Sequence, residues 1–440
     1  MNALTRILLA AAAGIAAAGF AAVGIAPAVA VPSDAQQAAS AAAQLGQLQE
    51  TLRRTHSSGD TVSYLGAAQS MHSFLNGSPR ATLQLMSAES VAGKQDDALR
   101  SFAQFVAMGQ ANDEALRAPQ FDPLRALPQF QAIQRDMAAN TSSMSNAAEV
   151  FRLNPSVPVP EDIDYDSATK RFYISSVLGK HIAAVDMTGQ VTMFTRAPDQ
   201  WSMMALKVDA ARRVLWATEA ALQGFTLAPE RDWGRSAVLL YDLRSGNLLA
   251  RIEGPPKAVL GDMTLDLNGD AIVSDGEHGG VYRVSRKTQS IERLDAGDFV
   301  SPQTPAVLSD GKHILVPDYV RGIGVLNLAT KQVAWIPMEG RYDLSGIDGL
   351  YAVGNTLIAT QNGTSPERVV QFALDASKTH VISESIIERA TPTLGDPTHG
   401  VMVAGYFYYI ANSGWDSLDD HGVLKDGTTL SAPMIMRAKL

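Results

Sequence analysis

The sequence predicts a mainly β protein, a six-bladed β-propeller preceded by an α-helical segment. In the C-terminal two-thirds, a short apolar run ending in a small polar residue occurs six times, and a second apolar run follows each copy. The copies recur at roughly forty to sixty residues, the spacing typical of propeller blades. The first runs are 172–176, 214–218, 271–275, 314–318, 357–361 and 408–412.

The last copy is incomplete, and this predicts how the ring closes. Most earlier copies supply one more strand, such as residues 191–195, but the sixth ends with the chain at Leu440. An unassigned strand-like run lies upstream of the first copy, at 149–153. Because an unpaired blade edge exposes backbone groups, we expect residues 150–153 to form the outer strand of the last blade. A two-sheet sandwich is the alternative.

Residues 1–30 have the pattern of a signal peptide. Arg6 precedes an apolar stretch, and Ala28, Val29 and Ala30 form a small-residue cleavage site. We therefore expect an exported protein, periplasmic or secreted, with no stable membrane span once the signal is removed. The alternative is an uncleaved membrane anchor, for which the apolar stretch is long enough.

Residues 31–140 are predicted to form an α-helical accessory segment, 141–148 a linker, and 149–440 the propeller. Leu45, Leu48 and Leu52 recur at helical spacing, as do Phe102 and Phe105. The segment resembles one or two degenerate tetratricopeptide repeats. Since fewer than three such repeats rarely stand alone, it is interpreted as a cap on the propeller. The other interpretation is a groove that binds a protein partner.

Charge and cysteine content exclude several classes of protein. The net charge of −9 argues against nucleic acid or an anionic membrane as a partner. The chain has no cysteine, which excludes disulfides, thiolate metal sites and cysteine nucleophiles. An exported protein of this kind must be held together by its hydrophobic core.

Aligning the blades predicts which side chains face the central channel. Carboxylates and an imidazole from several blades fall near one end of it, where their repulsion would be relieved by a cation. Oxygen ligands suit Ca²⁺, Mg²⁺ or Mn²⁺. The candidate ions are therefore these three and Zn²⁺. The alternative is that the acids accept local backbone N–H groups. The aligned column is Asp162, Ala205, Asp262, Thr304, Asp348 and His399, preceded by Glu161, Met204, Gly261, Gln303, Ile347 and Thr398.

A second polar column lies at the ends of the first runs. We expect most of its members to make hydrogen bonds between blades rather than to contact a ligand. They are Ser176, Thr218, Asp275, Asp318, Gln361 and Asn412.

The blade motifs resemble the senescence marker protein/gluconolactonase family, also called regucalcin-like, over about residues 150–440. The motifs include Pro160-Glu-Asp-Ile-Asp, Gly261-Asp-Met-Thr, Pro302-Gln-Thr-Pro and Gly346-Ile-Asp-Gly. The resemblance implies a six-bladed propeller that binds a divalent metal in its channel and hydrolyses lactones or related esters. By position, Glu161 matches the family's first metal ligand, and Asp348 matches the ligand that also acts as base. Gln303 stands where the family has Asn.

Two functions follow as hypotheses. The first is a metal-dependent hydrolase of a small-molecule lactone or ester, with Glu161, Asp262, Gln303 and Asp348 as metal ligands. In it Asp348 and His399 would be the catalytic residues, with Asp348 handling the proton. The second is a non-catalytic propeller that binds a small ligand or a protein.

Overall fold

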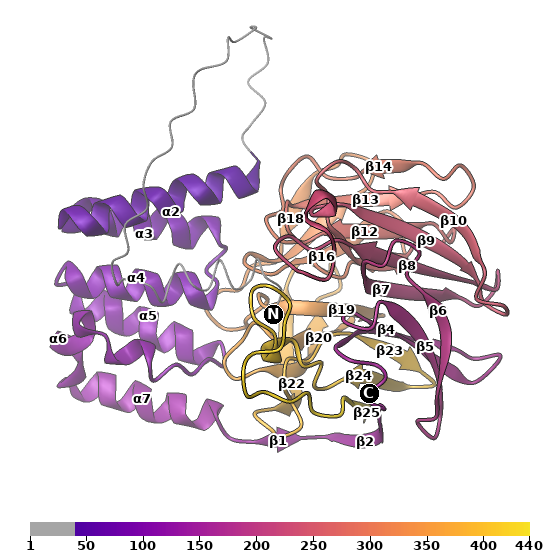
Figure 1. Ribbon diagram of the computed structural model, residues 1–440. Coiled ribbons are helices and arrows are strands. Elements are labelled where there is room, and N and C mark those ends of the chain that lie inside the picture. Colours follow the sequence, from indigo (N-terminus) through magenta and orange to yellow (C-terminus); the bar gives the residue numbers. More distant parts are fainter. Residues whose placement is uncertain (1–39) are drawn as a thin grey trace, which may run out of the picture.

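The computed structural model describes residues 40–440 and shows six antiparallel sheets arranged as a propeller, with helices on one face (Figure 1). The predicted fold class is confirmed. The predicted signal peptide, residues 1–30, lies outside the described residues. Within residues 40–440, no helix is both long enough and apolar enough to cross a membrane.

Each blade takes its strands in chain order, and the first strands of neighbouring blades contact one another around the channel. Blade one has β3 (Pro160–Asp166), β4 (Arg171–Ser176), β5 (His181–Asp186) and β6 (Val191–Arg196); blade two has β7 (Ser202–Asp209), β8 (Val214–Ala220), β9 (Ser236–Asp242) and β10 (Leu248–Glu253). Blade three has β11 (Leu260–Leu265), β12 (Ala271–Asp275), β13 (Gly280–Val284) and β14 (Ile291–Arg293); blade four has β15 (Ala306–Val307), β16 (His313–Asp318), β17 (Gly322–Asn327) and β18 (Val333–Trp335). Blade five has β19 (Ile347–Val353), β20 (Thr356–Gln361), β21 (Arg368–Leu374) and β22 (Val381–Arg389); blade six has β23 (Gly400–Val403), β24 (Tyr406–Ile410) and β25 (Met434–Lys439).

The ring closes through the N-terminal strand, as predicted. β2 (Ala147–Arg152) pairs antiparallel with β25 and completes blade six, and Leu153 N–H donates to the Pro433 carbonyl at 2.8 Å. The strand begins earlier than the expected 150–153. Residues 141–148, expected to be a linker, also contain β1 (Met144–Ser145), which pairs with the outer edge of β22. The chain thus covers one blade edge before it completes the next, which satisfies backbone groups that would otherwise be exposed.

Hydroxyl groups at the ends of the second strands link neighbouring blades. The Thr218 hydroxyl donates to the Gly261 carbonyl at 2.9 Å, and the Ser274 hydroxyl donates to the Gln303 carbonyl at 3.0 Å. The Thr360 hydroxyl donates to the Thr398 carbonyl in the same way. Of the column predicted to make interblade bonds, only Thr218 makes one of these three, and in blades three and five the donor is the residue before the predicted one. The prediction for most of that column was therefore wrong, since Asp275 and Asn412 bond within their own blades. These bonds fix the start of the next blade's first strand, where the channel residues lie.

Helices occupy residues 41–140, named here the helical layer. Glycines with left-handed φ at Gly59, Gly77 and Gly93 turn the chain between successive antiparallel helices. The Phe102 and Phe130 rings contact each other at 4.9 Å between centroids in a buried core. The helices are α2 (Ala41–Ser58), α3 (Thr61–Phe74), α4 (Pro79–Val91), α5 (Gln95–Ala107), η1 (Ala115–Arg117), η2 (Pro119–Phe121), α6 (Asp122–Arg125) and α7 (Pro128–Asn140).

The helical layer contacts loops of blades three, four and five (Figure 1). Ala41 N–H donates to the Gly297 carbonyl at 2.8 Å, and Asn76 Nδ2 donates to the Ile336 carbonyl at 2.9 Å. These loops lie at the end of the propeller where the first strand of each blade begins. The predicted channel residues lie at the same end. The resemblance of the helices to tetratricopeptide repeats stays a prediction.

Candidate functional site: an acidic cluster at one end of the channel

The predicted channel residues lie in or beside the first strands of blades one, three, four, five and six. Atoms of Glu161, Asp262 and His399 that could bind a metal lie within 4.8 Å of one another, and all three residues are buried. Asp348 is buried outside this group, but its charge raises the pKa of Glu161. The sequence therefore correctly grouped side chains that are as much as 238 residues apart.

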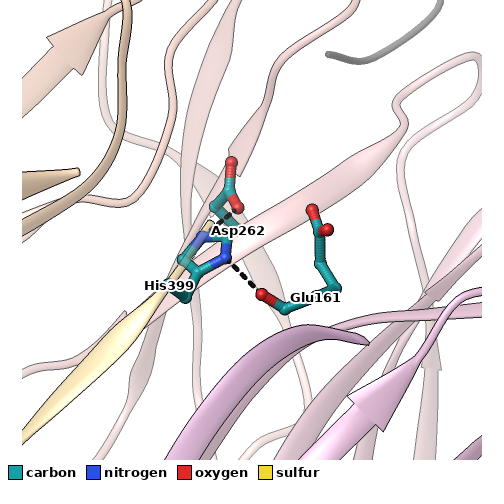
Figure 2. Close-up of side chains that lie close together, drawn as sticks. All are labelled: Glu161, Asp262 and His399. Atoms are coloured by element: carbon teal, nitrogen blue, oxygen red, sulfur yellow. Dashed lines mark hydrogen bonds and ion pairs between the residues drawn. The ribbon is translucent and has the colours of Figure 1, made fainter. Parts of the chain in front are cut away.

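His399 is held at both ring nitrogens (Figure 2). Nδ1 lies 2.8 Å from the Glu161 main-chain oxygen, and Nε2 lies 2.9 Å from Asp262 Oδ1 and 2.7 Å from the Thr304 hydroxyl. Burial alone would lower the pKa of His399, but nearby acids, first Asp162 and then Asp262 and Asp348, raise it well above its usual range. This arrangement favours an imidazolium that donates both protons. Such a ring offers no lone pair to a metal or to a substrate proton.

The Glu161 carboxylate lies beside the His399 ring, with an oxygen within 4.8 Å of a ring nitrogen (Figure 2), and it accepts a hydrogen bond from Trp415 Nε1 at 2.5 Å. Burial, and then the negative charge of Asp348, raise the pKa of Glu161 to about 8. The charged form is therefore destabilised in the bare protein. A nearby cation would reverse that preference.

Asp348 accepts a hydrogen bond from Asn362 Nδ2 at 2.8 Å. Burial raises the pKa of Asp348 to about 6, and the His399 charge partly opposes this rise. Asp162 also lies near the cluster, since its charge raises the pKa of His399, but it is engaged in a structural ion pair. Its carboxylate accepts from Lys207 Nζ at 2.6 Å and from the Leu206 N–H at 2.9 Å, so it joins blades one and two.

The oxygens left without a donor fit a hard cation. Gln303 Nε2 donates to Ser301, to its carbonyl at 3.2 Å and its hydroxyl at 3.1 Å, so its amide oxygen lies on the other side of the amide group. Among the described residues, no donor reaches that oxygen or the second carboxylate oxygen of Glu161, Asp262 or Asp348. Three carboxylates and an amide are ligands that Ca²⁺, Mg²⁺ and Mn²⁺ prefer. The chemistry of these side chains therefore fits such an ion, and oxygens of Glu161 and Asp262 lie within 4.8 Å of each other.

A small cavity adjoins this cluster. Its volume is about 20 Å³, enough for about one water molecule or ion. Glu277, which sequence reasoning missed, lines it, and burial raises the pKa of this residue to about 7. The lining is Glu161, Met204, Leu222, Val259, Gly261, Asp262, Gly276, Glu277 and Trp415.

Two long loops cover this cavity. Residues 221–235 connect β8 to β9, and residues 411–433 connect β24 to β25. Thr226 N–H donates to the His421 carbonyl at 3.0 Å, and the Phe225 and Trp415 rings lie 6.1 Å apart between centroids. The loops thus meet at this end of the channel, and Leu222 and Trp415 from them line the cavity.

Sequence reasoning also missed Asn362 as a partner of Asp348. Asn362 directly follows Gln361, a member of the second polar column, and Glu277 lies two residues after Asp275 of the same column. Extending that column by two residues would have included both. Trp415 lies in a loop without a strand pattern, so no periodic pattern pairs it with Glu161.

No known family model and no curated protein matches this sequence. Solved structures with a similar fold include virginiamycin B lyase from Staphylococcus aureus, at 12% identity and a TM-score of 0.45 over 67% of this chain and 99% of that one. A gluconolactonase from Xanthomonas campestris has 14% identity and a TM-score of 0.46, covering 69% of this chain and 93% of that one. The calcium-binding protein regucalcin from Agrobacterium tumefaciens has 13% identity and a TM-score of 0.46, covering 67% and 93%. Similarity at this level says nothing about activity.

Proposed function

We propose that this protein is a hydrolase of a lactone or ester that binds one divalent cation at the acidic end of its channel. One observation carries the proposal: Glu161, Asp262, Gln303 and Asp348, from four different blades, each keep one oxygen that no donor among residues 40–440 reaches. A cation bound there would polarise the substrate carbonyl and stabilise the negative charge that develops on its oxygen.

Asp348 is the proposed base. Asn362 donates to one of its oxygens at 2.8 Å, and no donor among the described residues reaches the other, which could accept a proton. The carboxylate would take a proton from water as the water oxygen bonds to the carbonyl carbon. It would return that proton to the leaving oxygen as the C–O bond breaks. For a lactone, the product is the open hydroxy acid.

His399 would orient Asp262 rather than act as a base. Its charged ring donates to the Asp262 carboxylate and to the Glu161 main chain, which ties blade six to blades three and one. Its positive charge also offsets part of the repulsion among the acids. The catalytic role predicted for His399 from the sequence thus becomes a positioning role in this proposal.

The alternative function is a propeller that binds a ligand without chemistry. The covered cavity favours it, since a space of about 20 Å³ admits an ion or a water molecule but no lactone. The hydrolase proposal therefore requires the 221–235 and 411–433 loops to separate when substrate binds. A protein partner at the helical layer is a further proposal, and so is export, which amino-terminal sequencing of the mature protein would test.

Calorimetric titration tests the main proposal. Ca²⁺, Mg²⁺, Mn²⁺ and Zn²⁺ are titrated into chelator-treated protein, and lactone and ester substrates are then assayed with the ion that binds. Asp348→Asn keeps the side-chain volume but removes a charge, so affinity should fall by at least tenfold and turnover should be lost. Absence of both binding at millimolar metal and turnover in the wild type would leave only the non-catalytic propeller.

A further inference from the structure

The loop between β20 and β21 connects the acidic cluster to the helical layer. It begins after Gln361 and ends before Arg368, on the propeller end that carries both structures. One end of the loop holds a candidate catalytic side chain, and the other end is bonded to residues 110 and 111 of the helical layer.

At the site end, Asn362 is buried and fully engaged. Its Nδ2 donates to Asp348 Oδ2 at 2.8 Å, and its Oδ1 accepts from the Tyr319 hydroxyl at 2.9 Å. Asn362 therefore has one arrangement that satisfies both neighbours. A shift of its main chain would move the Asp348 carboxylate or break a buried hydrogen bond.

At the other end, Ser365 makes three hydrogen bonds to the helical layer. Ala111 N–H donates to the Ser365 carbonyl at 2.6 Å, and Ser365 N–H donates to Gln110 Oε1 at 3.1 Å. The Ser365 hydroxyl donates to the Ala111 carbonyl at 2.8 Å. Main chain and side chain of this one residue are thus both held by the loop that follows α5 in the helical layer.

The segment between the two ends of the loop is short and closely packed. Only Gly363 and Thr364 separate Asn362 from Ser365. A Cβ atom on Gly363 would lie 2.6 Å from Gly346 Cα and 2.6 Å from the Tyr319 hydroxyl oxygen, so its backbone is packed against two neighbours. The Thr364 hydroxyl donates to the Gln361 carbonyl at 3.1 Å. A displacement at Ser365 therefore cannot be absorbed before it reaches Asn362.

Buried polar groups reinforce this junction. Gln110 Nε2 donates to Asp343 Oδ2 at 3.0 Å, and Gln361 Nε2 donates to the Asp343 carbonyl at 2.9 Å. Arg368, only 1% exposed, donates to Gln361 Oε1 at 2.7 Å. If the helical layer moved away, Asp343 would lose a buried partner, which costs more than the hydrogen bond contributes. The network thus has one well-satisfied state, the docked one.

We infer that docking of the helical layer positions Asn362 and, through it, Asp348, so that Gln110 acts as a positioning residue for the channel site. The helical layer is then part of the functional unit and not only a cap. A ligand or protein that changes the docking would change the site. Measuring metal affinity as a test of this inference rests on the proposed function, whereas measuring hydrogen exchange does not.

The test uses the full chain with Gln110→Ala, Asn362→Ala and the double variant. Gln134→Ala is the matched control, since Gln134 is exposed on α7 and outside the network. Thermal melts first establish that each variant is folded. Hydrogen exchange in Gln110→Ala should quicken through residues 361–368 and at the start of β19, and should stay unchanged in the control.

Mn²⁺ or Ca²⁺ affinity, measured by calorimetry, should fall about fivefold in Gln110→Ala, as expected for one lost hydrogen bond. The double variant should be no weaker than Asn362→Ala, because Gln110 acts through Asn362. Additive losses, or faster exchange that stops at Ser365, would overturn the inference. If the wild type binds no metal, the proposed function fails, and hydrogen exchange alone then tests whether Gln110 positions Asn362.

Discussion

At the scale of single residues, each acid of the cluster is held by one specific donor. Trp415 holds Glu161, His399 holds Asp262, and Asn362 holds Asp348. Among residues 40–440 no donor reaches the second carboxylate oxygen of these three acids, so their orientation is fixed while most of their negative charge stays uncompensated. Asp162 shows the contrasting case, because Lys207 and a main-chain N–H occupy its carboxylate and make it a structural ion pair.

Asp166 allows a prediction of pH dependence. Arg213 donates to its two oxygens at 2.6 and 2.9 Å and lowers the pKa of Asp166 to about 2. A carboxyl with a lowered pKa stabilises the fold above its unfolded pKa, and this stability is lost as the pH falls toward 2. Arg213→Met should therefore lower the free energy of unfolding by about 2 kcal/mol at pH 7 and by about half of that near pH 3.

Urea denaturation at both pH values measures the difference. Arg212→Met is the control, because Arg212 is 39% exposed and its ion pair with Asp209 should contribute less than about 1 kcal/mol. An equal loss at pH 3 and pH 7 would show that Arg213 acts through packing and not through the charge of Asp166.

At the scale of elements, the first strand of each blade places the acids, while loops supply most of the groups that hold and cover them. Strand alternation therefore explains why Glu161 and Asp348 are near one another. It does not explain Trp415 or Asn362, which lie in the connections after β24 and β20.

Ring closure by β2 predicts the outcome of two truncations. Both remove the helical layer, but deletion of 31–145 keeps β2, and deletion of 31–156 removes it. The first should still melt cooperatively, whereas the second should not, because the edge of β25 would stay unpaired. Circular dichroism melts compare them. Equal melting of the two proteins would contradict closure by β2.

A disulfide engineered between the 221–235 and 411–433 loops should stop substrate from reaching the site until it is reduced. The native chain has no cysteine, so Thr226→Cys with His421→Cys introduces the only thiols, at positions joined by a main-chain hydrogen bond of 3.0 Å. The disulfide should abolish hydrolysis while metal still binds, and reduction should restore turnover. Each single variant is a control. Undiminished turnover in the fully oxidised protein would show that substrate reaches the site without separation of these loops.

At the scale of the whole molecule, the helical layer and the propeller share a buried polar interface. Gln110, Asp343 and Arg368 are all buried in it. Because the two parts share these buried hydrogen bonds and the packing around them, we expect calorimetry to show one unfolding transition for residues 31–440. Two separate transitions would show that the two parts unfold independently.

The sequence by itself determined the repeat, the number of blades, the closing strand and the acids that line the channel. All of these follow from local rules: strand residues alternate between two faces, turn residues interrupt them, and a ring leaves no open edge. The same rules predicted Glu161, Asp262, Asp348 and His399 at one end of the channel.

Only the tertiary structure decided what those residues contact. In the folded protein Asp162 pairs with Lys207, and Trp415 donates a hydrogen bond to Glu161. Glu277 lines the cavity, and the helices pack beside the site. Each of these contacts joins segments that no periodic pattern relates. The path of a loop and the position of a helix depend on long-range packing and on the pairing of buried charges. Such contacts exist only once the whole chain has folded.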